Sequence, residues 1–335
     1  MPQLGTGITP SGAAGAELQY ITRRAFVPKM VVQLYNSSPL IAAMLSNSQP
    51  ASGGLSQVTV PVQGASFVNM QWVGYDGSFA QPALQQGTQN LEFNLKGAVI
   101  PIPYVGFEGM IQDGHEVIKL LSARFNDATN VYKDAIATAL YGNANNTQQM
   151  IGLPGAVDDG TNSVFYGGLS RNVNTWLKSK RYAAASTNPT RATVMQYIVG
   201  TAKYSGEMPT FGVMGPGTWQ TLANDFLGLE RYNIDPGSSF DGTEYGARAG
   251  FKALMVAGIP IYLDPYCPEG TLYLINSGYQ ALYIHERAAF SFTGFQSTLP
   301  NFQLGSIGAV VSLLEMVNVK PKSCTVVTGF TYISI

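Results

Sequence analysis

The residues able to carry out acid–base or metal chemistry are few and scattered in this 335-residue sequence. Its only two histidines, His115 and His285, have no partner ligands at the spacing of a zinc site. A serine triad would need one of them beside a nucleophile, and the sequence has no Gly-x-Ser-x-Gly elbow. No acid–base constellation emerges, so we expect a protein that is not an enzyme.

Three further motifs could indicate a ligand-binding or disulfide site, but each lacks residues that such a site requires. The tract Gly215–Thr218 opens a predicted helix but lacks the lysine of a phosphate-binding loop. Asp158–Gly160 lacks the alternating oxygen ligands of a calcium loop. Cys267 and Cys324 are too few for a disulfide framework in a chain of this length and have no Cys-x-x-Cys spacing. We therefore expect neither a metal nor a cofactor.

Charged residues are scarce and unevenly placed. The 19 basic and 20 acidic residues make up 12% of the chain, where a soluble domain has about 25%. Asp76 is the only charged residue between Lys29 and Glu92, and none lies between Arg287 and Glu315. Because the cores of protein interfaces are depleted in charge, we expect these segments to lie against other subunits. The alternative is a neutral, solvated loop surface.

The overall composition excludes several classes of protein. Hydrophobic residues make up 45% of the chain, which excludes a disordered protein. A net charge of −1 argues against a dedicated reader of duplex DNA, although weak contact with nucleic acid stays open. Residues 1–19 have no basic segment ahead of an apolar run, and no span approaches ~18 uninterrupted apolar residues. The sequence predicts neither a signal peptide nor a membrane span.

The elements that must position any functional surface begin with an arm. A tract rich in Gly, Ala and Ser leads into Leu18–Leu45, where two possible short helices are interrupted at Pro28 and Pro39. Beyond it, apolar residues alternate over 58–62 and 68–72, and again over 91–95. The pattern predicts a long two-stranded hairpin. An isolated hairpin is marginally stable in water, so this one needs a surface to lie on.

One long helix is predicted over 113–141, with Asp113 as its N-cap and Gly142 as its stop. At about 1.5 Å per residue it would be roughly 43 Å long. From Thr190 helices and strands alternate, which indicates a second domain. We expect helices at 190–204 and 215–226, a loop at 228–250, strands at 210–214, 253–256, 260–263 and 271–275, and a strand-rich end at 281–330 with its longest strand at 310–319.

The order of these parts resembles the major capsid proteins of tailed bacteriophages, which have the Hong Kong 97-type fold. The arm, the charge-poor hairpin and the long helix are followed by Gly152–Gly155 and Tyr166–Arg171, then by Gly258–Asp264 in an α/β domain. The resemblance covers nearly the whole chain. It implies an α+β fold with these parts: an N-terminal arm (1–54), an extended hairpin called the E-loop (55–104), a peripheral domain (105–189) with a spine helix (113–141), an axial domain (190–280) and return strands (281–335).

The resemblance also implies a function and partners. Pentamers and hexamers of the chain would tile an icosahedral shell around double-stranded DNA, with contributions from a separate scaffolding protein, a portal and decoration proteins. The protein would be found in the virion capsid, assembled in the host cytoplasm, with no membrane partner. Some relatives crosslink an E-loop lysine, but Lys96 lies near the base of the hairpin, so we expect no crosslink.

Two sets of residues are candidates for contacts. Large apolar residues on a two-stranded ribbon have no core of their own, so the hairpin residues are expected to contact other subunits: Val58, Val60, Met70, Trp72, Phe93 and Leu95. Basic residues of the arm are candidates for contact with DNA: Arg23, Arg24 and Lys29.

Two rival interpretations stay open. A cellular nanocompartment shell, similar to encapsulins, has the same fold but encloses enzymes in place of DNA. A β-rich surface adhesin belongs to a different class and would carry a signal peptide.

Overall fold

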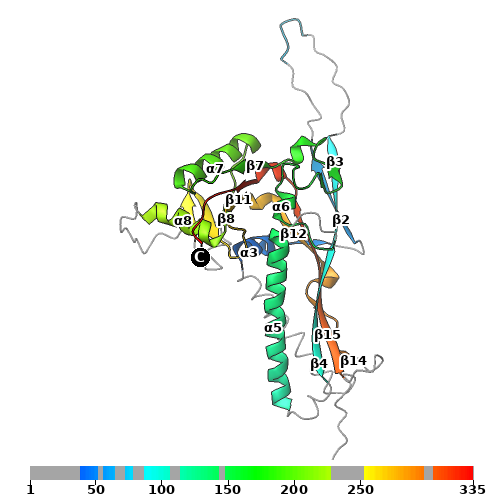
Figure 1. The fold of residues 1–335 in the computed structure, drawn as a ribbon. Coiled ribbons are helices and arrows are strands. Elements are labelled where there is room, and N and C mark those ends of the chain that lie inside the picture. The colour runs from blue at the N-terminus through cyan, green and yellow to red at the C-terminus, as the bar shows by residue number, and fades with distance from the viewer. Residues whose placement is uncertain are drawn as a thin grey trace, which may run out of the picture.

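A single long helix and a long pair of strands run side by side through the lower half of the molecule as viewed in Figure 1. The structure is a computed structural model and describes residues 38–51, 56–64, 72–77, 87–105, 114–142, 148–227, 253–297 and 305–334. At one end of the long helix the chain forms a second sheet that carries two helices, and a separate hairpin lies on the opposite side of that end. None of the described helices is long and apolar enough to span a membrane.

The first sheet is built around the longest strand, β15 (Gly305–Asn318), which the sequence placed at 310–319. On one side, β4 (Lys96–Val105) pairs antiparallel with it from Gly305↔Val105 to Leu314↔Lys96. Within the described residues β4 has no other partner, so it tolerates Pro101 and Pro103, which cannot donate backbone hydrogen bonds. The other strands of this sheet are β12 (Gln280–His285), β13 (Ser291–Phe292), β14 (Gln296–Ser297) and β1 (Gln49–Ala51).

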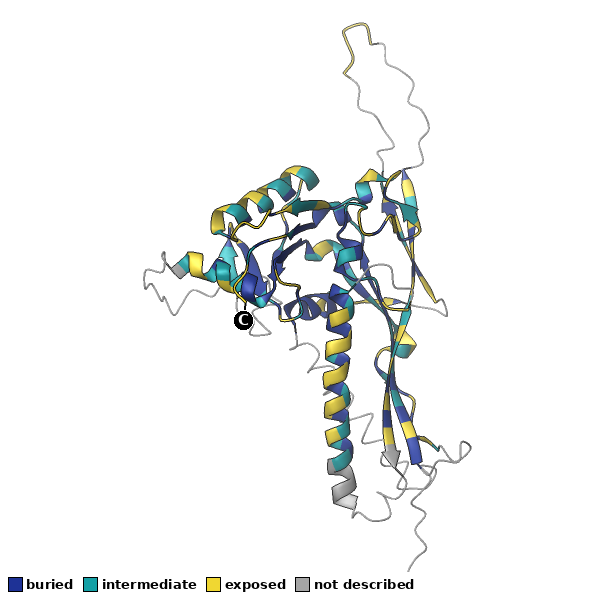
Figure 2. Ribbon diagram, viewed as in Figure 1, coloured by how far each residue is buried: buried dark blue, intermediate teal, exposed yellow. Residues whose placement is uncertain are grey.

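The long helix α5 (Gly114–Tyr141) confirms the predicted helix and packs on the inner face of β4 and β15. Its buried side chains recur every three or four residues, so they form one apolar stripe. Aromatic contacts also hold α5 against β13 and the residue before it, because the Phe125 ring centre lies 6.0 Å from that of Phe292 and the Tyr132 ring 5.7 Å from that of Phe290. Figure 2 shows the opposite face of α5 exposed along much of its length. The buried residues of α5 include Leu121, Phe125, Tyr132, Ile136 and Leu140.

The second sheet has the strand order β7-β16-β11-β8-β10-β9. Its central strands β8 (Phe211–Met214) and β11 (Thr271–Ile275) are buried at every position, as expected for a sheet covered on both faces. Helices α7 (Arg191–Ser205) and α8 (Pro216–Leu227) cover one face, and both confirm predicted helices. The remaining strands are β7 (Lys180–Ala183), β9 (Ala253–Val256), β10 (Ile259–Leu263) and β16 (Thr325–Thr328).

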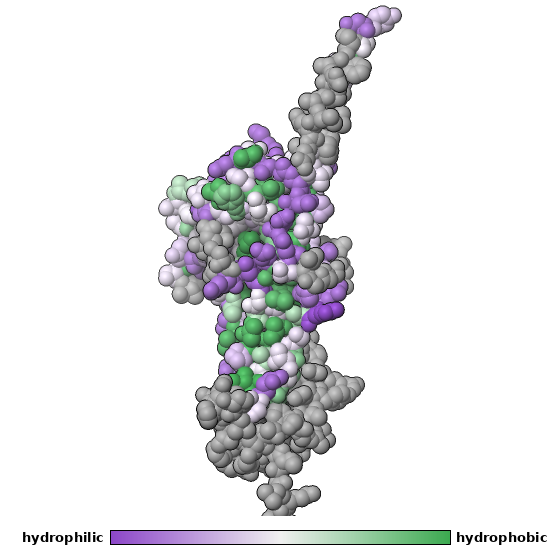
Figure 3. All heavy atoms as spheres, turned by 90° about the vertical axis from the view of Figure 1, so that its right-hand side faces the viewer, coloured by the Kyte–Doolittle hydropathy of each residue, from purple (hydrophilic) through white to green (hydrophobic). Residues whose placement is uncertain are grey.

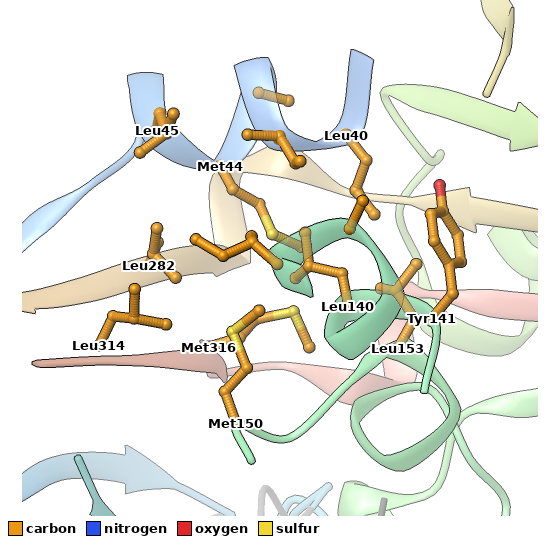
Figure 4. Close-up of a cluster of buried hydrophobic side chains, with 14 of the residues drawn as sticks. Leu40, Met44, Leu45, Leu140, Tyr141, Met150, Leu153, Leu282, Leu314 and Met316 are labelled. Carbon is orange, nitrogen blue, oxygen red and sulfur yellow. The ribbon is translucent and has the colours of Figure 1, made fainter. Parts of the chain in front are cut away.

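The segment before the hairpin differs from the prediction. Pro39 was expected to interrupt a helix, but it begins helix α3 (Pro39–Ser46) at a first-turn position, where a missing backbone N–H costs nothing. Seven of the eight helix residues are buried. Figure 4 shows Leu40, Met44 and Leu45 of α3 packed against Leu140 of α5 and side chains of β12 and β15. This part of the expected arm therefore belongs to the core of its own subunit.

A buried carboxylate joins three parts of the fold. Asp264, at the end of β10, accepts hydrogen bonds from the Ser38 hydroxyl ahead of α3 and from the Tyr141 hydroxyl, 2.8 Å away, at the end of α5. Its other oxygen accepts from the Tyr266 backbone N–H at 3.0 Å. Burial raises the pKa of Tyr141 well above its ordinary value, so this hydroxyl stays a donor. Asp264 thus fixes the end of α5 against the second sheet.

Candidate assembly surface

The predicted hairpin is present and one of its faces is buried within the same chain. Strands β2 (Gln57–Gln63) and β3 (Thr88–Asn94) pair antiparallel with Val58 opposite Phe93. Val58 is 8% exposed and Phe93 2% exposed. The expectation that these two side chains lack a core of their own is therefore wrong. Sequence periodicity finds a two-faced ribbon but cannot show that a distant segment covers one face.

That covering segment is a short second hairpin, β5 (Phe165–Tyr166) and β6 (Leu169–Ser170). The Glu92 backbone N–H donates to the Gly167 carbonyl at 3.0 Å, and the Tyr166 ring meets Phe93 edge-on with centres 5.1 Å apart. Gly167 adopts a positive φ of 55°, and a Cβ there would lie 2.9 Å from Leu91. Only glycine fits at this point, so the turn lets β3 approach closely.

A buried arginine holds the covering segment in shape. Arg171 is fully buried and donates hydrogen bonds to the carbonyls of Gly155, Ser163 and Leu177, at 2.6, 2.9 and 3.2 Å, as well as to that of Ala156. Its guanidinium also lies 3.7 Å from the buried Asp158 carboxylate and 4.9 Å from the centre of the Tyr166 ring. Burial lowers the pKa of Arg171, but an arginine stays charged at neutral pH. Arg171 therefore links the segments that carry these carbonyls to β5 and β6, and we call this assembly under the hairpin the platform.

Just beyond β2 and β3, two glycines join the two sides of the hairpin; we call this point the neck. The Gly64 backbone N–H donates to the Gly87 carbonyl at 3.0 Å, and Gly64 lies so close to Trp176 that a Cβ would come within 2.2 Å of the indole ring. Past the neck, residues 72–77 form a turn in which the Gly77 N–H donates to the Gly74 carbonyl. Trp72 is 91% exposed there, and Val73 and Tyr75 are exposed beside it.

A second exposed apolar surface lies on the outer face of β4 and β15. Four cross-strand pairs face outward along it, and none contains a charged or hydrogen-bonding side chain: Leu313↔Gly97, Val311↔Val99, Ala309↔Pro101 and Ile307↔Pro103. Each of these eight residues is exposed or half-buried. We call this surface the ribbon face. Figure 3 views the side of the molecule that carries β4 and β15 and shows hydrophobic residues gathered there. A contiguous exposed apolar surface of this kind is typical of an interaction site.

The other predicted contact residues divide into three groups. Trp72 is fully available for contact, whereas Val60 and Leu95 are half-buried. Met70 lies outside the described residues, as do Arg23, Arg24 and Lys29. The sequence predicted that the uncharged stretch ahead of Glu315, which contains most of β15, lies against other subunits, but it did not show that β4 pairs with β15 to complete the ribbon face.

The residues first considered for chemistry have structural roles where the structure describes them. The His285 Nδ1 accepts from the Arg287 backbone N–H at 3.2 Å. Gly217 and Thr218, at the start of α8, donate their backbone N–H groups to the Glu269 carboxylate. Within the described ranges there is no cluster of three or more potential metal ligands.

A buried carboxylate under the ribbon links it to the chain that follows α5. Glu315 of β15 accepts from the Ile151 backbone N–H at 2.7 Å through Oε1, while Oε2 has no hydrogen-bond partner in the described structure. Burial raises its pKa from 4.5 to about 7, an effect that the Ile151 N–H and the charge of Lys96 partly oppose. The folded state therefore favours the protonated acid.

The free energy of unfolding is expected to fall as pH rises from about 4.5 to above 7. A folded-state pKa above the unfolded value stabilises the fold below pH 4.5, and this contribution is lost as pH rises through about 7. The shift corresponds to about 3 kcal/mol. Glu315→Gln keeps the neutral form at every pH, so thermal melts at pH 8 should show it several degrees more stable than the parent. The exposed Glu286→Gln serves as the control, and a Glu315→Gln melting curve that follows the parent at every pH would contradict the assignment.

Three solved structures have the same fold over nearly the whole chain. The cyanophage A-1(L) capsid asymmetric unit matches with a TM-score of 0.65 and 17% identity, over 88% of this chain and 93% of that one. The holo-SrpI encapsulin complex from Synechococcus elongatus PCC 7942 has a TM-score of 0.55 at 9% identity, over 88% and 90%. The capsid of a native GTA particle has a TM-score of 0.54 at 10% identity, over 87% and 90%. No protein-family model matches the sequence, and no curated protein matches it either.

The arrangement of a long helix, a hairpin, a strand ribbon and a second sheet is therefore the α+β fold of capsid and encapsulin shell proteins. This confirms the Hong Kong 97-type fold expected from the order of the parts.

Proposed function

We propose that this chain is the major capsid protein of a tailed bacteriophage and forms pentamers and hexamers that close into an icosahedral shell around double-stranded DNA. The observation that carries the proposal is the ribbon face, an apolar surface with no cover in the described chain, on a fold shared with the cyanophage A-1(L) capsid. A protein that works alone has no use for such a surface, whereas a shell subunit buries it against its neighbours.

The energetics suit assembly through many similar contacts. A standard interface buries about 1,600 Å², and its gross hydrophobic gain of about 40 kcal/mol is largely offset by association and ordering costs. Only a few kcal/mol per contact need remain, because each subunit makes several contacts at once. Trp72 and the ribbon face offer the apolar side chains for such contacts.

In this proposal the segments take the roles expected from the sequence. Residues 1–54 are the arm, 55–104 the E-loop, 105–189 the peripheral domain, 190–280 the axial domain and 281–335 the return strands. The burial of α3 and the strand pairings suggest three refinements. Residues 39–46 would belong to the core of the subunit and not to the arm. The sheet of the axial domain would also take β7 and β16, and β4 would belong with the peripheral ribbon. A scaffolding protein, a portal and decoration proteins complete the assembly in the host cytoplasm, and the shell itself has no enzymatic activity.

Electron microscopy of the purified chain, alone and with its scaffolding protein, tests the proposal. We expect uniform closed particles with pentameric and hexameric capsomers. A chain that stays monomeric in both conditions would overturn the proposal.

A nanocompartment shell is the second candidate, and the observation that supports it is the match to the encapsulin complex. The two differ in content, so particles purified from the native source decide between them. Double-stranded DNA inside supports the phage capsid, and an enclosed protein supports the nanocompartment.

Truncation of the exposed tryptophan tests the contact role of the hairpin. Trp72→Ala should raise the concentration needed for shell formation by roughly 30-fold, since loss of an interface tryptophan costs about 2 kcal/mol or more. Light scattering over a concentration series measures this threshold. Trp72 is 91% exposed, so the melting temperature of the subunit should not change. An unchanged threshold would remove Trp72 from the contact.

A further inference from the structure

Two lysine side chains lie over one tyrosine ring at the edge of the second sheet, and two more lysines lie beside that tyrosine in the chain or through a backbone hydrogen bond. The Nζ atoms of Lys180 and Lys322 lie 5.8 and 5.0 Å from the centre of the Tyr204 ring. The Tyr204 hydroxyl donates to the Lys178 carbonyl, and the exposed Lys203 precedes Tyr204 on α7. We call Lys178, Lys180, Lys203 and Lys322 the lysine cluster. Three separate elements supply it: β7 with the residues before it, the end of α7 and the 3-10 helix η6 (Pro321–Ser323).

Positive charge is concentrated in this region in a chain that has little charge elsewhere. The four lysines, together with the charged residues linked to them through Tyr204, through ion pairs or by closeness in sequence, make seven basic and three acidic residues, so the local excess is four positive charges. The other 325 residues hold twelve basic and seventeen acidic residues, because the whole chain has 19 and 20. The basic set is Lys178, Lys180, Lys203, Lys320, Lys322, Arg171 and Arg181, and the acidic set is Asp158, Asp159 and Glu207.

The acidic groups are already engaged. Glu207 pairs with Lys320 at 2.7 Å, and Asp158 lies against Arg171 and Arg181. Asp159 accepts from the Thr161 backbone N–H. The four lysines of the cluster have no carboxylate within ion-pair distance in the described structure. Like charges held close together repel, and a bound anion relieves that repulsion.

We propose that the lysine cluster around Tyr204 binds the phosphate backbone of the enclosed double-stranded DNA, without reading its sequence. The proposal rests on the proposed function, because it takes DNA to be the content of the shell. Lysines are mobile point charges that suit irregularly placed phosphates, whereas the cores of protein interfaces are depleted in lysine. The observations therefore favour a nucleic acid over an acidic protein partner.

The test compares two triple variants that lose the same charge. The cluster variant is Lys180→Gln, Lys203→Gln and Lys322→Gln, and the control is Lys133→Gln, Arg191→Gln and Arg287→Gln. Fluorescence anisotropy with the unassembled full-length chain and a labelled 30-base-pair duplex of arbitrary sequence gives affinity against salt. The plot of log affinity against log salt should become shallower by roughly 3 in the cluster variant, about 0.9 for each phosphate that no longer meets a lysine. Affinity at 50 mM salt should fall at least about tenfold.

Several outcomes would overturn the proposal. Equal salt slopes in the cluster variant and the control would show that the cluster makes no phosphate contacts. Tighter binding of polyglutamate than of DNA, abolished only in the cluster variant, would assign the surface to an acidic protein.

Microscopy of the same variants keeps the two proposals separate, since loss of DNA affinity with normal shells supports both. Absence of shells from the unaltered chain, with the cluster effect intact, would count against the proposed function alone.

The position of the cluster in the shell gives an independent check. A bulky amine-reactive reagent that cannot enter closed particles should label Lys180 and Lys322 only after the shells are dissociated. Labelling of both lysines in intact shells would place the cluster on the outside and overturn the proposal.

Discussion

Replacing Val99 with lysine is expected to abolish shell formation and leave the subunit folded. Val99 is 58% exposed at the middle of the ribbon face, opposite Val311, so a lysine there is solvated in the free subunit. Between subunits the same charge would be buried without a partner, which costs about 4 kcal/mol per contact. That cost raises the assembly concentration by roughly a thousandfold. Sedimentation and electron microscopy measure the yield of shells, and circular dichroism measures the melting temperature of the subunit.

A matched substitution on the long helix separates this effect from the mere addition of a charge. Val131 is 57% exposed on α5, between Asp127 and Asp134 one turn away on either side, so Val131→Lys adds the same charge to a polar face. It should assemble like the parent. Val99→Thr keeps the shape and adds no charge, so its yield should be intermediate. Normal shells from Val99→Lys would mean that the ribbon face is not an interface.

Elements with a clear hydrophobic period were predictable from the sequence. The long helix was placed within one residue of its observed start, because Leu121, Phe125 and Tyr132 recur at the helical period and face one sheet. The hairpin was predicted because Val58 and Val60 alternate with polar residues, as do Leu91 and Phe93 opposite them. A local sequence pattern is enough to predict an element wherever the residues of that element alone determine which of its faces is apolar.

Features that depend on distant partners were not predictable. Pro39 signals a break in isolation, yet it begins a helix whose apolar residues are buried against β12 and α5. Arg171 gave no sign of its role, since its acceptors are backbone carbonyls whose positions only the fold determines. The ribbon face required knowledge that β4 pairs with β15, two strands separated by about 200 residues of sequence. The lysine cluster likewise joins residues from three elements.

Arg171→Met is expected to destabilise the folded subunit by about 3 to 5 kcal/mol. The methionine fills part of the same space but leaves four buried carbonyls without their donor and Asp158 without its nearest cation. Arg171→Lys should recover little, because one ammonium group cannot reach acceptors spread over Gly155, Ser163 and Leu177. Denaturant unfolding followed by circular dichroism gives the free energies. Exposed Arg287→Met, a matched control, should change stability by less than about 0.5 kcal/mol.

The double variant Arg171→Met with Asp158→Asn tests whether the destabilisation comes from the stranded charge or from the stranded carbonyls. Asp158 keeps three backbone donors, from Gly160, Asn162 and Ser163, so its own charge is partly compensated. We therefore expect the second substitution to restore no more than about 1 kcal/mol, and Tyr166 to lose its fixed position against Phe93. Shell yield should then fall together with stability, because β5 and β6 no longer hold the hairpin in place. Full recovery in the double variant would show that Arg171 serves only to neutralise Asp158. Normal shells from Arg171→Met would show that the hairpin acts in assembly without support from the platform.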